Sequence, residues 1–392
     1  MGLAESAIQN GKSAVSGKIN ILFAIDYFHR TGGTEKHLAQ LVRLLPRDTF
    51  RCSVVVFDLG ANALTDGMRA AGVPVHHVPV RRIYTPNALR RAAELARIIR
   101  REKIDIVQTF HQTSDTFGAI VAKLSGVKRI ISSKRDTGQL KRPVHILLNR
   151  WLRFLFNRTI VVADAVGEAV MATERIDRSR ITRIYNGVDT VEFTPPNTAE
   201  AAAARSRLGF DGGDFVVGMV AGFRPEKNYD IFFQGAVKAM TAIPSLKVLA
   251  VGGGPLLGHF RALYDIERFR SRIVFTGEAE DVAQYLKAMD VGCLIPGKNE
   301  GFSNAVLEKM ATGLPMIVTE VGGNAEAVID GENGIVIPPV DPQAFRAALV
   351  RMHSDPAARL AMGRRSRELV EQRYSLQGMC RKHEALYLSL CV

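Results

Sequence analysis

The chain has 392 residues, of which 47% are apolar and 23% charged, so its length predicts two domains and its composition is typical of a water-soluble globular protein. Its four cysteines are widely scattered and form no CxxC pair, which indicates a reducing, cytoplasmic compartment and excludes a disulfide framework and a zinc site. The net charge is +13, and no uncharged apolar run approaches the roughly 20 residues that a membrane-spanning helix needs.

The positive charge is concentrated in one stretch of the first half. Residues 81–158 contain 18 Lys and Arg against 5 Asp and Glu, which leaves 34 of each sign in the rest of the chain. This stretch is either a solvated basic face or a surface that meets an anionic partner. A nucleic-acid partner fits poorly, because the stretch has no recognisable binding motif and lies in an enzyme-like domain.

Residues 1–17 predict a flexible polar lead-in, and strands alternate with amphipathic helices after it. Strands are expected at 18–26, 52–57, 105–110, 129–133 and 159–163, with a helix at 87–102 among the connecting segments. A break rich in Pro, Asn and Thr follows at 185–200 and reads as a linker. Strands are then expected again at 215–222, 246–254, 272–277, 290–296 and 314–319.

This alternation predicts an α/β fold in which two Rossmann-like, doubly wound units follow one another, at 18–190 and at 191–375. Parallel sheets of this type carry helices on both faces. They bind ligands at the carboxyl ends of their strands, so two facing units would form a cleft between them.

The segment EGFSNAVLE at 300–308 lies where a strand ends and a helix begins. Ser303 is a good N-cap for that helix and Gly313 ends it, and free backbone N–H groups around Gly301–Ala305 would bind an anion. The carboxylates of Glu300 and Glu308 repel phosphate and suit hydroxyls instead. A nucleotide-diphosphate sugar offers both groups. The alternative is a capped helix with two surface glutamates.

Two further segments also lie where a predicted strand ends, and each is compatible with phosphate binding. AGFRPEKN at 221–228 places Arg224 and Lys227 at a helix start, where cations oppose the helix dipole unless an anion binds there. VGGGP at 251–255 is a glycine-rich turn. Each has a simpler reading, as exposed basic residues on a loop or as a tight turn. Three phosphate-compatible exits in one domain favour a phosphate-containing ligand.

The stretch 290–334 strongly resembles the donor-binding region of the retaining glycosyltransferases of family 4, whose hallmark Glu-x7-Glu pair is met by Glu300 and Glu308. PEKN, VGGGP, FTG and NGVD occur in the family's order, and GGTEKHLAQL at 32–41 is similar to its N-terminal glycine loop. The resemblance spans nearly the whole chain. It implies a GT-B fold, with the acceptor on the 18–190 domain, the nucleotide sugar on the 191–375 domain, and a last helix at 376–392 that crosses back to the first domain.

The resemblance also implies roles for single residues. Glu308 would hold the ribose hydroxyls, Glu300 the transferred sugar, and Lys227 the departing diphosphate in place of a metal ion, so neither a metal nor another cofactor is expected. Further donor contacts are implied at Gly33, Gly253, Gly277 and Gly301 and at the backbone amides of Phe302, Ser303, Asn304 and Ala305.

Two positions of the predicted site leave a choice open. His111, just past the 105–110 strand, matches a family histidine that faces the reacting carbon of the sugar, and the alternative is a core or surface histidine. Many family members carry an arginine five positions before the motif lysine, where this chain has Gly222. Arg224 is the candidate substitute.

Residues 141–158 combine arginines with apolar side chains at helical spacing. Arg142, Arg150 and Arg153 accompany Trp151 and Phe154, as in a helix that lies in a membrane interface. The alternative is a helix that packs on the sheet and has basic flanks. We hypothesise docking on an anionic membrane, at the inner face of the cell membrane and near a lipid-linked acceptor.

These inferences predict a metal-independent retaining hexosyltransferase that moves a sugar from a nucleotide-diphosphate sugar to a membrane- or lipid-linked saccharide, in surface polysaccharide or glycolipid assembly. A UDP-sugar is favoured over a GDP-sugar by family frequency alone. One rival is a soluble transferase that acts on a small molecule. The other is a binding protein that keeps the fold without activity.

Overall fold

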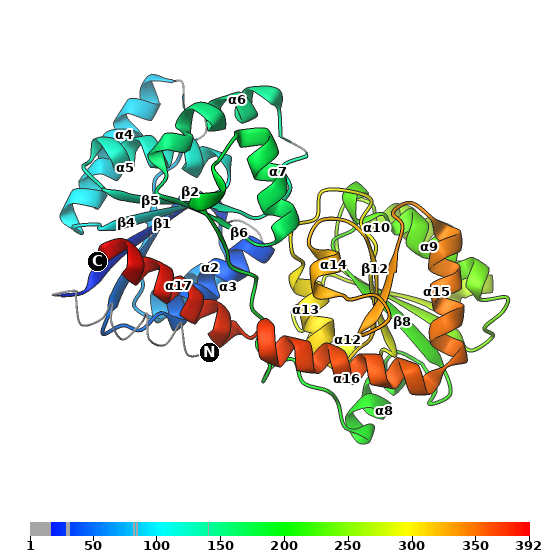
Figure 1. The fold of residues 1–392 in the computed structure, drawn as a ribbon. Coiled ribbons are helices and arrows are strands. Elements are labelled where there is room, and N and C mark those ends of the chain that lie inside the picture. The colour runs from blue at the N-terminus through cyan, green and yellow to red at the C-terminus, as the bar shows by residue number, and fades with distance from the viewer. Residues whose placement is uncertain (1–16, 29–31, 81–82, 84, 140) are drawn as a thin grey trace. The chain divides into compact units, whose positions relative to one another are not determined.

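The computed structural model of the protein describes residues 17–28, 32–80, 83, 85–139 and 141–392, so the predicted lead-in at 1–17 lies almost wholly outside the described residues. The chain divides into two compact units, each with its own sheet (Figure 1). Unit 1 consists of the residues up to Asn186 and the segment Gln377–Val392, and unit 2 is Gly187–Leu376.

Unit 1 has a parallel sheet of seven strands, counted over the described residues, in the order β3-β2-β1-β4-β5-β6-β7. Its strands are β1 (Ile19–Phe28), β2 (Phe50–Leu59), β3 (Val75–His77), β4 (Ile106–Phe110), β5 (Arg129–Lys134), β6 (Arg158–Val161) and β7 (Ile181–Arg183). Its helices are α2 (Gly33–Leu44), α3 (Ala63–Ala70), α4 (Pro86–Arg101), α5 (Ala119–Leu124), α6 (Pro143–Leu152), α7 (Asp164–Glu174) and α17 (Leu376–Cys391), with short helical turns η1 (Ser114–Gly118), η2 (Arg153–Leu155) and η3 (Arg178–Arg180).

Helices cover both faces of the unit 1 sheet. Leu22 and Ala24 of β1 lie in one core with α4, α5 and Phe156, whereas Phe23 between them contacts the ring of Tyr387 in α17. Successive side chains of a strand point to opposite faces, so a strand buried on both faces reads as an uninterrupted apolar run. The predicted arrangement of layers is confirmed.

Unit 2 has a parallel sheet of six strands, again counted over the described residues, in the order β10-β9-β8-β11-β12-β13. Its strands are β8 (Phe215–Val220), β9 (Leu246–Val251), β10 (Ile273–Gly277), β11 (Val291–Leu294), β12 (Met316–Thr319) and β13 (Gly334–Ile337). Its helices are α8 (Thr198–Arg207), α9 (Tyr229–Ala239), α10 (Leu257–Tyr264), α11 (Glu267–Arg270), α12 (Ala283–Leu286), α13 (Asn304–Ala311), α14 (Asn324–Ala327), α15 (Pro342–Ser354) and α16 (Pro356–Arg373), with a short turn η4 (Pro225–Lys227).

The sequence did not predict β3, β7 and β13. Each is only three or four residues long and lies at an edge of its sheet. Edge strands are often short and partly exposed, so they show neither a long apolar run nor a clear alternation.

Candidate active site

Five neighbouring strands of unit 2 deliver their following loops to one edge of the sheet. The loops after β9, β8 and β11 carry the predicted residues Gly253, Arg224, Lys227, Glu300 and Gly301, and Gly277 is the last residue of β10. Backbone hydrogen bonds join them, from Gly252 N–H to Gly277 O at 2.9 Å, from Phe223 N–H to Gly253 O at 2.8 Å and from Gly323 N–H to Gly301 O at 2.6 Å. The loops at the carboxyl edge of the sheet are therefore linked to one another, and doubly wound folds bind ligands at this edge.

Close backbone approaches at this edge require glycine at two positions. A Cβ atom at Gly252 would lie 2.1 Å from Ala221 O, and one at Gly322 would lie 1.9 Å from Glu300 O. Both residues also have positive φ, which side chains rarely tolerate. The loops after β8 and β11 thus lie so close to the loops after β9 and β12 that Gly252 and Gly322 cannot carry a side chain.

Lys227 and Glu300 meet at the centre of this edge. Lys227 Nζ lies 2.7 Å from Glu300 Oε2, and the two side chains are 24% and 12% exposed. The neighbouring Asn228 and Asn299 have φ of 57° and 53°. Asparagine tolerates this left-handed conformation better than most residues, and such conformations often occur at functional sites. The structure thus brings two of the predicted catalytic residues into direct contact.

Helix α13 begins beside Glu300. Ser303 occupies the N-cap position, as predicted, although its hydroxyl makes no capping hydrogen bond. At the other end, Gly313 N–H donates to Met310 O and Leu314 N–H to Lys309 O, which is a Schellman motif with Gly313 at φ 79°.

The other predicted residues of this segment lie just before α13 and in its first turns. Phe302 is 4% exposed and its ring packs against Tyr374 at 5.3 Å, so its side chain belongs to the core of unit 2. Glu308 is 9% exposed and follows Asn304 and Ala305 by one turn. Binding of a ligand by the amides at the helix start stays a prediction.

Lys309 is a buried residue that the sequence analysis missed. Its side chain is fully buried, and its Nζ donates to Ala305 O at 3.0 Å. Burial lowers the pKa of Lys309 to about 8, although the neighbouring Glu308 raises it. No pattern in the sequence distinguishes this lysine from a surface lysine, because its burial depends on how α13 packs over Gly292 of β11.

Arg224 lies beside the position where many family members carry an arginine. A Cβ atom at Gly222 would lie 3.6 Å from Arg224 Nε. The Arg224 side chain therefore occupies the space next to Gly222, and the loop after β8 keeps a guanidinium there.

The predicted residues of unit 1 also lie at strand exits. Gly33 is the first residue of α2. His111 directly follows β4 with a φ of 75° and stacks on Tyr27 at 4.7 Å. Asp26, which the sequence analysis missed, accepts hydrogen bonds from the backbone N–H groups of Thr113 and Ser114, both at 2.7 Å. Burial raises the pKa of Asp26 to about 6.

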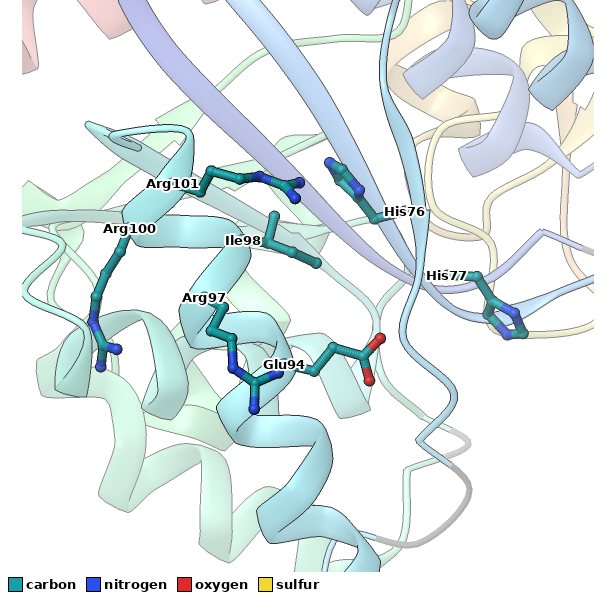
Figure 2. A pocket seen from close by; sticks show the side chains of 7 residues that line it. All are labelled: His76, His77, Glu94, Arg97, Ile98, Arg100 and Arg101. Carbon is teal, nitrogen blue, oxygen red and sulfur yellow. The ribbon is translucent and has the colours of Figure 1, made fainter.

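A hollow of about 590 Å³ in unit 1 contains none of the predicted residues. It lies between β3 and α4 and is lined by His76, His77, Glu94, Arg97, Ile98, Arg100 and Arg101 (Figure 2). Its lining is basic, since three arginines and two histidines surround one glutamate. Its three arginines belong to the basic 81–158 stretch.

No group of three or more His, Cys, Asp or Glu side chains could hold a metal ion among the described residues. In the same part of the chain, no helix is both long and apolar enough to cross a membrane.

Comparison with known proteins identifies the family. Residues 31–192 match the profile described as Glycosyltransferase Family 4, and residues 214–355 match that of Glycosyl transferases group 1. The protein thus belongs to the family 4 glycosyltransferases, and its two Rossmann-like units form the GT-B fold. The predicted family and fold are confirmed.

Two relatives illustrate the family assignment, and one solved structure illustrates the fold. The Escherichia coli UDP-Gal:alpha-D-GlcNAc-diphosphoundecaprenol alpha-1,3-galactosyltransferase is 27% identical, over 92% of this chain and 94% of its own. The Bacillus anthracis N-acetyl-alpha-D-glucosaminyl L-malate synthase is 24% identical, over 78% of this chain and 80% of its own. The crystal structure of Anabaena Alr3699/HepE in complex with UDP superimposes with a TM-score of 0.83 at 20% identity, and covers 95% of this chain and 100% of that one.

Proposed function

We propose that the protein is a retaining, metal-independent glycosyltransferase that moves a hexose from a UDP-sugar to a lipid-linked saccharide. The contact between Lys227 and Glu300 at the carboxyl edge of the unit 2 sheet carries the proposal. It supplies one cation for a diphosphate and one carboxylate for sugar hydroxyls, next to an α-helix N-terminus that favours negative charge.

In the proposed reaction, the bond between the anomeric carbon and the diphosphate oxygen breaks, and a bond from that carbon to an acceptor hydroxyl oxygen forms on the same face. The acceptor proton passes to the departing phosphate, so no protein nucleophile is needed. Lys227 exchanges its contact with Glu300 for the diphosphate and stabilises the charge that develops on it. Glu300 is then available to orient the transferred sugar.

The UDP-sugar and the lipid-linked acceptor are supported by the relatives. The Escherichia coli relative is named for transfer from UDP-Gal to a diphosphoundecaprenol-linked sugar, and the Anabaena structure contains UDP. Relatives from Rhizobium are named as lipopolysaccharide core mannosyltransferases. Assembly of a surface polysaccharide or glycolipid is the corresponding role.

A small water-soluble acceptor is the second candidate. It is favoured by the relatives named for L-malate and for D-inositol 3-phosphate as acceptors. Activity on such an acceptor without any lipid would support this candidate over the first.

Calorimetric titration with UDP and with GDP in the presence of EDTA tests the donor site. We expect saturable binding of UDP. Binding only after Mg²⁺ is added would contradict metal independence, and binding of GDP alone would contradict the proposed base. Anomeric proton couplings of the product in NMR test retention. No turnover of any UDP- or GDP-sugar, with either lipid-linked or soluble acceptors, would favour a binding protein instead.

A further inference from the structure

Three apolar side chains of helix α6 are exposed to solvent, whereas a polar side chain of the helix faces the protein. In α6, all of whose residues the structure describes, Asn149 alone is fully buried. Val144, Leu147 and Trp151 are 61%, 55% and 73% exposed, and Phe154 in the following turn η2 is 65% exposed. Their spacing of three, four and three residues places these four side chains on one face, which we call the α6 stripe.

Buried polar contacts fix this orientation of α6. Asn149 Nδ2 donates to Glu174 Oε1 at 2.7 Å, and Gln112 Nε2 donates to Asn149 Oδ1 at 2.8 Å. Glu174 is also paired with Lys134 and Lys141, at 2.8 and 2.7 Å. Rolling the helix to bury the stripe would break the Asn149 contacts and leave a buried carboxylate short of partners, which is unfavourable.

Basic side chains lie on the helix that carries the α6 stripe and on other helices of unit 1. Arg142 is exposed at the N-cap of α6, and the guanidinium of Arg153 lies 4.1 Å from the ring centroid of Phe154. Arg150 is more constrained than the sequence analysis expected, because its Nε donates to Thr173 O at 2.6 Å. Helices α4 and α5 share a core with η2 and carry the exposed basic side chains Arg90, Arg97, Arg100 and Lys123.

The positive charge of this surface indicates which partner binds the α6 stripe. The 81–158 stretch contains 18 basic and 5 acidic residues, so a second copy of the chain would bring like charge against like. An anionic lipid bilayer offers an apolar interior for the stripe and phosphates for the arginines. Tryptophan and phenylalanine next to arginine is the composition of helices that lie in a bilayer interface.

We propose that the α6 stripe is a membrane contact, which inserts into the boundary between headgroups and acyl chains of an anionic bilayer. Positive charge on α4, α5 and α6 draws the protein to the surface, and the four apolar side chains then hold it there. The proposal concerns the protein's own contact with lipid and does not depend on which acceptor is glycosylated.

Trp151 is the only tryptophan in the chain, so the unmodified protein reports on its own contact. We expect its emission to shift to the blue on vesicles that contain phosphatidylglycerol, and brominated acyl chains to quench it. Phosphatidylcholine vesicles should bind the protein less, and added salt should release it from the anionic ones. Equal binding to both vesicle types, or binding without a change in Trp151 emission, would overturn the proposal.

Substitutions test whether the α6 stripe, and not any exposed apolar side chain, binds the vesicles. Leu147→Ser with Phe154→Ser should weaken vesicle binding at least about tenfold. Val191→Ser with Leu360→Ser is the matched control, because these residues are 82% and 63% exposed in unit 2 and should leave binding unchanged. Both variants should still bind UDP. That binding would show that they are folded and that a loss of vesicle binding does not come from damage to the donor site. A dimer in solution that Leu147→Ser dissociates would identify a second copy as the occupant and overturn the proposal.

Discussion

Lys227 and Glu300 are far apart in the chain and meet only because β8 and β11 are neighbours in the sheet. Lys227→Ala should lower turnover by about 10²–10³, because one stabiliser of the departing charge is lost. Steady-state kinetics measure this. Lys287→Ala is the control, since Lys287 is also 24% exposed and lies 2.7 Å from a glutamate, yet has no predicted role. Turnover of the Lys227 variant within about a factor of three of the unmodified enzyme would contradict its role.

Arg224 is expected to replace the arginine that is missing at position 222. Arg224→Ala should raise the KM for the donor roughly tenfold or more, because a hydrogen bond to a charged group contributes about 1.5–3 kcal/mol. A side chain fits at Gly222, where a Cβ atom would meet nothing closer than 3.6 Å. The double variant Gly222→Arg/Arg224→Ala should therefore recover the KM. No recovery, or no effect of Arg224→Ala alone, would show that the guanidinium does not bind the donor.

Among single residues, the sequence predicted those whose role follows from their position directly after a strand. Lys227, Glu300 and His111 each follow an apolar run, so they were recognised at strand exits. Asp26 and Lys309 were missed, although both lie near the predicted residues. Their significance comes from burial, which depends on packing between segments distant in the chain and leaves no local pattern.

Among the elements, α17 has a buried contact that should respond to pH. His37 of α2 and His383 of α17 lie 5.4 Å apart, and burial lowers the pKa of both, that of His383 to about 4. The unfolded chain takes up protons near pH 6.5, whereas the folded state does not until lower pH, so the free energy of unfolding falls as the pH drops from 6.5 toward 4. The loss should reach about 3 kcal/mol for His383 alone.

Thermal unfolding and amide exchange of α17 between pH 7 and pH 4 measure this loss. His383→Phe should reduce the pH dependence, and His259→Phe, at an exposed histidine of unit 2, should not. Unchanged exchange of α17 in acid would contradict the role of the histidine pair.

Across the whole molecule, the two units should respond differently to nucleotide. Saturating UDP should slow amide exchange at the carboxyl edge of the unit 2 sheet, around Lys227, Gly277 and Gly301, because ligand that binds only the folded state at 100 times its Kd adds about 2.7 kcal/mol of stability. Helices α4, α5 and α6 of unit 1 should be unaffected. Exchange mass spectrometry measures both, and protection confined to unit 1 would contradict the placement of the donor site.

The sequence predicted the architecture at this scale because each unit repeats one pattern of apolar strands and amphipathic helices. The stretch 290–334 was long and specific enough to indicate the family by itself. By contrast, the exposure of the α6 stripe depends on Asn149 and Glu174, which meet only in the folded unit. The periodicity of residues 141–158 fits either face toward the protein, so it left the membrane hypothesis and a packed helix equally open.

The return of the last segment to unit 1 has a consequence for the time course of synthesis. Tyr387 of α17 packs on Phe23 and Phe50 and donates to Gln108, so the core of unit 1 is complete only when Gln377–Val392 has left the ribosome. All of unit 2 is translated in between, which takes roughly 10 to 40 s at about 5–20 residues per second. During that delay the nascent first unit lacks the side chains of α17 that cover Phe23 and Phe50, so the order of translation makes the second unit the first to reach its final form.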